Sequence, residues 1–322
     1  MKKTLLAILC ILQFSMIFAI NAKYESEDYN LNVNYNDVIT PGDAIFVRMT
    51  ILNNKNHKKS KADSDKKAVL QLLQEKKVIE SAAFYTLKTK KQNNIEMLAG
   101  IPVSLWLKEG NYSIKVIFEE TPSSVKEFIL PSRLVMKTFP EEIIELDAKN
   151  TSIKTDNSPE RAAQIDKLNN ILFTTMPSDI FSLKKFTAPT DSQRYTAYCG
   201  DRRTYAYSNG KSSTSLHYGN DYGVPTGTDV KACAAGKVVM AENRISTGWS
   251  VVVEHLPGLY SLYYHMSELS VKEGDMVNQG QLLGKSGATG LATGPHLHWE
   301  IRLNGSAVRP EFFLNDFTFE EN

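Results

Sequence analysis

The 322-residue sequence predicts a mainly β protein with an N-terminal β-sandwich-like domain, a short helical linker and a compact antiparallel β domain at its C-terminal end. Apolar residues alternate with polar ones in short segments on both sides of residue 150, which is typical of strands. Helical spacing of apolar residues is found only near residue 165. The length allows two or three domains, each with its own core.

The N-terminal domain is predicted over residues 23–140. Period-two patterning marks strands at Asn30–Tyr35, Ile45–Ile51 and Ser113–Phe118, with turn residues between them. Short strands at this spacing indicate a small sandwich, of which the immunoglobulin-like fold is one form. The lysine-rich stretch His57–Lys67 reads either as a solvated hairpin loop, which we expect, or as a contact for an anionic polymer.

Residues 141–194 are predicted to be a linker with one helix. Ser158 and Pro159 form a helix start, and apolar residues then recur at helical spacing, so we expect a helix over residues 159–173. The C-terminal domain is predicted over residues 195–315, with a tail at 316–322. Its strands are expected at Val251–Glu254, Leu259–His265 and His296–Leu303.

The first 22 residues resemble a targeting segment. Lys2 and Lys3 precede an apolar stretch from Leu5 to Ile20, and Ala22 offers a small residue for cleavage. This order predicts a secretory signal peptide over residues 1–22. The alternative is an uncleaved membrane anchor, although about 16 apolar residues are few for a ~30 Å span. We expect export to the periplasm or cell envelope, with membrane contact only if the segment is retained.

Charge and cysteine content argue against a nucleic-acid partner and against metal binding by cysteines. The net charge of +1 gives no broad basic surface, so we expect no nucleic-acid partner. Beyond Cys10, the chain has Cys199 and Cys233, which form either one disulfide or two small buried thiols. Neither lies in a CxxC or Cys/His array, which argues against thiolate ligation of a metal.

Five of the six histidines lie between residues 217 and 298, and histidine is the commonest metal ligand. In the stretch HYGND the glycines disfavour a helix. As extended chain, His217, Gly219 and Asp221 share one face, and Gly219 leaves room between two ligands. In HLHWE the same period places His296 and His298 on one side.

These spacings predict a metal site. His217, Asp221 and His298 make up the two nitrogens and one oxygen expected of catalytic zinc, with one position left for water. His265 and His296 are then free to act on a proton and on a developing oxyanion.

Several motifs in this region occur in the order of one family. They are HYGND at 217–221, a PTGT to GKVV run from Pro225 to Val239, YYHM at 263–266, VKEGDMVNQGQLLGKSGATG at 271–290 and GPHLHWEI at 294–301. Residues 195–315 therefore resemble the lysostaphin-type (LytM-type) zinc metalloendopeptidases, which cut the peptides of bacterial peptidoglycan.

The resemblance implies one zinc ion bound by His217, Asp221 and His298. It implies that His265 and His296 flank a zinc-activated water as general base and transition-state stabiliser, in an exported hydrolase that cuts peptidoglycan peptide stems or bridges. Two alternatives remain open. One is a non-catalytic family member that binds and activates other cell-wall hydrolases, and the other is a zinc peptidase that acts on protein substrates.

Three further residues carry expectations. We expect His255 to be a structural residue outside the metal site. Glu300 either orients His298 as a second-layer carboxylate or is a surface or structural carboxylate, and we favour the latter. Asn220 departs from the family pattern, in which an aliphatic residue is usual, and activity should survive if its side chain points away from the metal.

Overall fold

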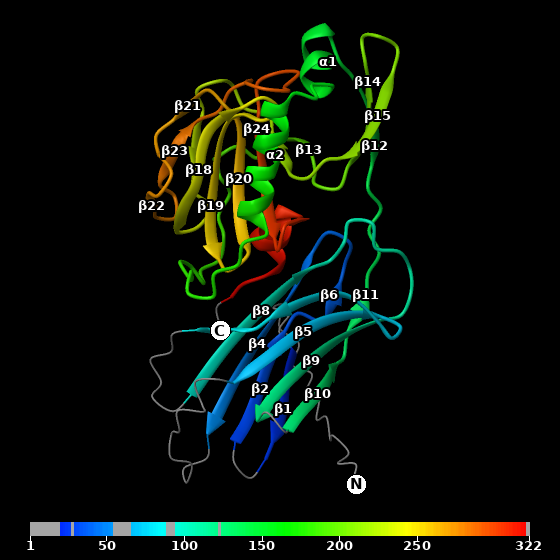
Figure 1. Cartoon of the computed structure of the whole chain (residues 1–322), viewed down its shortest axis with the longest axis vertical. Coiled ribbons are helices and arrows are strands. Elements are labelled where there is room, and N and C mark those ends of the chain that lie inside the picture. Colours follow the sequence, from blue (N-terminus) through cyan, green and yellow to red (C-terminus); the bar gives the residue numbers. More distant parts are fainter. Residues whose placement is uncertain (1–19, 27–28, 54–65, 88–93, 122–123, 320–322) are drawn as a thin grey trace. The chain divides into compact units, whose positions relative to one another are not determined.

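The computed structural model describes residues 20–26, 29–53, 66–87, 94–121 and 124–319. The chain divides into two compact units (Figure 1). The first comprises residues 1–103 and 107–136, and the second comprises residues 104–106 and 137–322. Each unit has its own sheets and its own buried core. The mainly β character predicted from the sequence is confirmed.

Two antiparallel sheets form the first unit. In spatial order the first sheet contains β1 (Ile20–Glu25), β2 (Tyr29–Tyr35), β4 (Ala44–Asn53), β8 (Asn94–Pro102) and β7 (Tyr85–Leu87). The second sheet contains β10 (Ser124–Leu130), β9 (Tyr112–Thr121), β5 (Lys67–Gln74) and β6 (Lys77–Ala83). A short parallel pair joins β3 (Val38–Ile39) to β11 (Arg133–Leu134). Inward side chains of both sheets share one core, so the predicted sandwich and its three predicted strands are confirmed.

Strand β2 shows how the sequence produces this core. Its tyrosine, leucine and valine side chains are buried, whereas the three intervening asparagines are half-buried on the opposite face. The period of two therefore assigns one apolar face to the sandwich interior.

Two predictions fall partly or wholly outside the described residues. Residues 1–19 of the predicted signal segment lie outside them, while Ile20–Ala22 form the start of β1 and pair with β2. Most of the lysine-rich stretch at 57–67 also lies outside them. Within the described part of the chain, no helix has the length and apolar character needed to cross a membrane.

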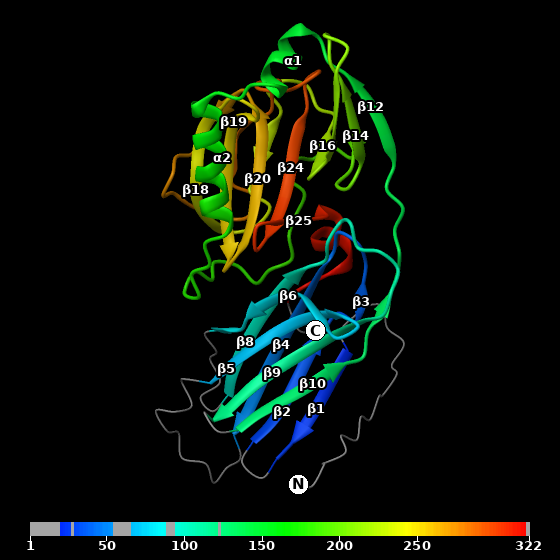
Figure 2. The same ribbon diagram turned by 45° about the vertical axis from the view of Figure 1, so that its right-hand side comes forward.

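The second unit is built on one large antiparallel sheet (Figure 2). Its spatial order is β13 (Tyr195–Ala197), β16 (Asn220–Tyr222), β24 (Leu297–Leu303), β20 (Leu259–Met266), β19 (Gly248–Leu256), β18 (Gly236–Arg244) and β22 (Met276–Val277), with β25 (Ser306–Val308) paired to β24. One smaller sheet contains β12 (Glu141–Glu145), β14 (Arg202–Ala206) and β15 (Ser212–Leu216). Another contains β17 (Asp229–Lys231), β23 (Leu282–Lys285) and β21 (Glu268–Leu269). A π-helical turn at Phe312–Asp316 lies near the C-terminus.

Helix α2 (Pro159–Leu172) packs on this large sheet. The Ser158 hydroxyl accepts a hydrogen bond from the Arg161 backbone amide, which caps the first turn as predicted. Leu172 is buried at the last turn against Leu262 and Tyr264 of β20 and their neighbours. The predicted helix is confirmed, and Phe173 is its C-terminal cap.

The segment before α2 is more structured than a linker with one helix. Strand β12 pairs in parallel with β14, and α1 (Ala148–Lys154) follows it. The Asp147 carboxylate caps α1 by accepting from the Asn150 amide, and Asn150 and Thr151 are buried. The sequence prediction missed both elements because α1 has no apolar stripe and the partner of β12 is distant in the chain. Cys199 and Cys233 are free and buried, so the thiol alternative holds.

We expect Leu172→Ala to lower the free energy of unfolding of the second unit by about 2–5 kcal/mol, because the truncation leaves a cavity against the sheet. Chemical denaturation followed by tryptophan fluorescence measures this, since Trp249 and Trp299 both lie in the second unit. Ile165→Ala on the same helix is the control, because Ile165 is 41% exposed. Equal losses in the two variants would contradict the packing described for α2.

Candidate metal centre

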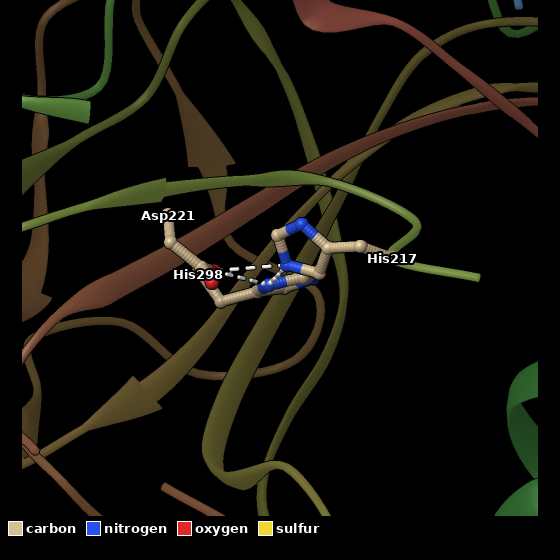
Figure 3. Close-up of side chains that lie close together, drawn as sticks. All are labelled: His217, Asp221 and His298. Atoms are coloured by element: carbon tan, nitrogen blue, oxygen red, sulfur yellow. Dashed lines mark hydrogen bonds and ion pairs between the residues drawn. The ribbon is translucent and has the colours of Figure 1, made fainter. Parts of the chain in front are cut away.

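Three potential ligands converge beside strands β16 and β24 of the large sheet, as Figure 3 shows for their side chains. His217 directly follows β15, Asp221 is the middle residue of β16, and His298 is the second residue of β24. Strands β16 and β24 are antiparallel, with Asp221 opposite His298. Directly opposed residues project to the same face of a sheet, so the ladder itself brings these two side chains together.

The donor atoms lie close to one another. His217 Nε2 is 3.1 Å from Asp221 Oδ1 and 2.9 Å from His298 Nδ1, and His298 Nδ1 is 2.7 Å from Asp221 Oδ1. A tetrahedral zinc site with ligand distances of about 2.0–2.1 Å has edges of about 3.3 Å. Small outward shifts of these side chains therefore accommodate such an ion.

The path from His217 to Asp221 differs from the predicted single extended stretch. The chain bends at Gly219, between His217, which follows β15, and Asp221, which lies in β16. A Cβ atom on Gly219 would lie 2.4 Å from the Trp299 backbone oxygen and 2.8 Å from Glu300 Cγ. Glycine is required here by the close approach of β24 and not by a need for room between the ligands.

Hydrogen bonds on the outer side of each imidazole fix which nitrogen faces the centre. His217 Nδ1 donates to the Tyr198 backbone oxygen at 2.9 Å, and His298 Nε2 donates to Glu300 Oε1 at 2.9 Å. A carbonyl or carboxylate oxygen only accepts, so the proton sits on these outer nitrogens. The inner nitrogens, His217 Nε2 and His298 Nδ1, then face the centre, where a metal ion would take the place of the proton between His298 and Asp221.

Glu300 is a buried partner of His298, so a surface position is wrong, and its contact fits the second-layer alternative that we did not favour. The carboxylate also accepts from Arg302 Nε at 2.6 Å. Although burial raises the pKa of Glu300, Arg302 and His298 outweigh it and lower the pKa to about 2. The side chain alternation of β24 places Glu300 on the same face as His298, which made this contact foreseeable.

The charges and lone pairs of the three donor groups favour a cation between them. Although burial raises the pKa of Asp221, His217 and His298 hold it well below its usual value, so it is a carboxylate. Burial lowers the pKa of His298, but hydrogen bonds to Asp221 and Glu300 raise it to about 9. A negative oxygen and two inward-facing nitrogens are stable at these distances when a proton or a metal ion lies among them. The residues present therefore fit a zinc ion.

His265 and His296 lie beside the three donors, as the sequence predicts. Their rings are 4.7 Å apart, and His296 Nε2 is 3.8 Å from Asp221 Oδ1. His265 Nδ1 donates to the Thr289 oxygen and His296 Nδ1 to the Gly294 oxygen, both at 2.8 Å. Each ring therefore keeps its Nε2 lone pair free. His265 also has a φ of 59°, a left-handed conformation that is uncommon for residues other than glycine.

Both imidazoles are neutral at pH 7. Burial is the main cause that lowers the pKa of His265 to about 3, with a further contribution from His296. Burial also lowers the pKa of His296, against the opposing effect of Asp221. A neutral ring with a free Nε2 accepts a proton, so this pair has the chemistry of a general base.

Sequence reasoning missed several supporting groups. Arg203 Nη2 donates to the outer oxygen of Asp221, Oδ2, at 3.1 Å. The Tyr264 ring is parallel to the His298 ring, with an angle of 2° and centroids 5.6 Å apart. Arg203 lies 18 residues from Asp221 and has no motif that marks it. Only the pairing of β14 with β15 brings it to the centre.

Asn220 and His255 lie away from the centre. Asn220 is opposite Trp299 in the ladder, on the face away from His298, and its Oδ1 accepts from the Cys199 amide at 2.9 Å. His255 is buried, with Nδ1 donating to the Ala235 oxygen at 2.9 Å and Nε2 2.7 Å from Ser261 Oγ. The predicted structural role of His255 is confirmed.

Comparison with known proteins identifies this part of the chain. Residues 215–310 match the model of peptidase family M23. The chain contains an M23 peptidase domain. The peptidoglycan DD-endopeptidase ShyA of Vibrio cholerae is 42% identical over 92 residues, which cover 29% of this chain and 21% of ShyA. Stage II sporulation protein Q of Bacillus subtilis is 32% identical over 181 residues, which cover 54% of this chain and 62% of that protein.

The fold is shared over a larger part of the chain. A crystal structure from Pseudomonas aeruginosa, named for peptidase M23, superposes with a TM-score of 0.54 and 21% identity. The match covers 87% of this chain and 96% of that one. The likeness therefore extends well beyond the M23 domain, although the matched segment spans only about a fifth of ShyA.

We expect Glu300→Gln to weaken zinc binding by about 10–100-fold, because a neutral amide supports the His298 tautomer less well than a carboxylate does. Competition with a chromophoric chelator at fixed pH measures the dissociation constant. Glu268→Gln in the exposed part of β21 is the control. Unchanged affinity in Glu300→Gln would contradict the role assigned to this carboxylate.

The buried His255 should make stability depend on pH. Burial lowers its pKa to about 4, whereas the unfolded value is about 6.5. Below pH 6.5 the unfolded chain takes up a proton that the folded protein does not, so stability falls with pH down to about 4. Between pH 7.5 and 5.0 the wild type should lose about 2 kcal/mol more than His255→Gln. Denaturant unfolding at both pH values measures this, and identical losses would refute it.

Proposed function

We propose that the protein is a zinc-dependent endopeptidase that hydrolyses peptide cross-links of bacterial peptidoglycan. The observation that carries the proposal is the convergence of His217, Asp221 and His298 beside two neutral imidazoles, His265 and His296. The M23 domain supports peptide hydrolysis, and the name of ShyA supports a peptidoglycan substrate.

In this proposal His217 Nε2, Asp221 Oδ1 and His298 Nδ1 hold one zinc ion. When bound, zinc supplies Lewis acidity, which lowers the pKa of coordinated water to about 7 and polarises a peptide carbonyl. The outer hydrogen bonds from His217 to Tyr198 and from His298 to Glu300 keep both rings oriented toward the ion.

His265 and His296 act in this proposal on the proton and on the developing negative charge. Either ring accepts a proton from the attacking water at its free Nε2, while its Nδ1 stays bonded to a backbone oxygen. The protonated Nε2 then donates to the oxyanion or to the leaving amine. Two charged rings 4.7 Å apart would repel each other, so only one of the pair carries the proton at a time.

Export is part of the proposal because peptidoglycan lies outside the cytoplasm. Its support is the order of Lys2, Lys3 and the apolar stretch from Leu5 to Ile20, which is typical of a secretory signal. The periplasm or cell envelope is the location that we propose.

A second candidate is a non-catalytic member that binds and activates other cell-wall hydrolases. The similarity to stage II sporulation protein Q favours it, because that name specifies no hydrolase and the aligned segment is long. The presence of all three ligands and both imidazoles favours catalysis instead. A zinc peptidase with protein substrates is the third candidate.

The test is digestion of purified sacculi with mass spectrometry of the released muropeptides. We expect release by the zinc-loaded wild type and none by His298→Ala, which removes a ligand. His265→Ala should keep a full zinc complement and lose about 10²–10⁴-fold in rate, because it removes only a proton-transfer group.

Parallel digests of denatured protein separate the substrate classes. Cleavage of protein but not of sacculi would support the third candidate. Sacculus binding by a fully zinc-loaded wild type without any release would support the second candidate and refute the proposed activity.

A further inference from the structure

The outer oxygen of the ligand Asp221 is held by a chain of two more side chains. Arg203 Nη2 donates to Asp221 Oδ2 at 3.1 Å, and Arg203 Nε donates to Glu142 Oε1 at 2.5 Å. The Arg203 side chain is only 13% exposed. Both partners of its guanidinium are carboxylates, so the group is fixed from two sides by charge-assisted hydrogen bonds.

Strand pairing explains why Glu142 reaches Arg203. Strand β12 runs parallel to β14, with Glu142 opposite Arg203. The two residues are 61 positions apart in sequence, and Glu142 lies outside residues 215–310 that match the M23 family model. Glu142 therefore comes from the segment that precedes α1 and that the sequence presented as a linker.

This geometry has two consequences for a cation among the donors. With Oδ2 held by Arg203, Asp221 presents only Oδ1 to the centre, which favours a single-oxygen ligand. A guanidinium beside a metal ion also adds positive charge, and the Glu142 carboxylate offsets that charge. Arg203 without Glu142 would be less well placed and more repulsive to the ion.

The rest of the same segment contacts loops that lie next to the two other imidazoles. Arg161 Nε donates to Ser246 Oγ at 3.0 Å, next to Thr247, whose oxygen accepts from the His265 amide. Asn150 Nδ2 donates to the Ala292 oxygen at 3.4 Å, two residues before Gly294, which accepts from His296. The segment 141–172 thus contacts a residue that holds the metal ligand Asp221 and loops that lie next to the imidazoles of His265 and His296.

We propose that Arg203 is a positioning residue for the metal ligand Asp221 and that Glu142 holds Arg203 in place. Strand β12, which carries Glu142, therefore contributes to metal affinity. The inference rests on the metal site of the proposed function. It adds residues that lie outside the family match and assigns them an effect on metal affinity.

A double-mutant cycle on the full chain tests this. Zinc dissociation constants are measured by chelator competition for the wild type, Arg203→Met, Glu142→Gln and the double variant. Arg203→Met should weaken zinc binding by about 10–100-fold, and Glu142→Gln by about 3–10-fold. Because Glu142 acts through Arg203, adding Glu142→Gln to Arg203→Met should cause no further loss. Arg203→Lys, which keeps the charge, should restore part of the affinity.

The controls are Glu141→Gln and Arg202→Met, the neighbours of the two residues. The Arg202 guanidinium stacks on Trp106, 3.9 Å from the ring centroid, and donates to the Gly200 and Leu105 backbone oxygens instead of to a ligand of the centre. Both controls should therefore match the wild type in zinc affinity. Wild-type affinity in Glu142→Gln, or an equal effect of Glu142→Gln with and without Arg203, would overturn the inference. Absence of zinc binding by the wild type would instead refute the proposed function.

Discussion

The second unit depends on one electrostatic constraint, the convergence of a carboxylate and two imidazole nitrogens within 3.1 Å of one another. Such donors repel unless a cation lies among them, and their outer atoms must be bonded because burial removes water. Tyr198, Glu300 and Arg203 satisfy those outer atoms. The surrounding architecture supplies these partners from separate strands and loops.

The large sheet provides the rigidity that this arrangement needs. Strands β16, β24 and β20 are paired in register, so Asp221, His298 and the stacked Tyr264 occupy neighbouring positions on one face. Helix α2 packs its Leu172 on the same face, against Leu262 and Tyr264. The core that stabilises the sheet and the side chains that form the centre therefore share one surface, which couples stability to site geometry.

The boundary of the functional unit follows from these contacts. The family match begins at residue 215, whereas the compact unit begins at residue 137 and also includes residues 104–106. Strand β12, α1 and α2 lie between these limits and bond to strands and loops of the site. A protein trimmed to the family match would lack Arg203, its partner Glu142 and the helix that covers the sheet.

The sequence by itself determined the β character, helix α2 and all five histidine and aspartate positions of the site, because period-two patterning, a capped helix and dense motifs are local signals. Tertiary structure alone decided the bend at Gly219, the free state of Cys199 and Cys233, and the role of Arg203. Those features arise where strands distant in sequence meet. Their partners are chosen by register and close packing, and no local pattern encodes that choice.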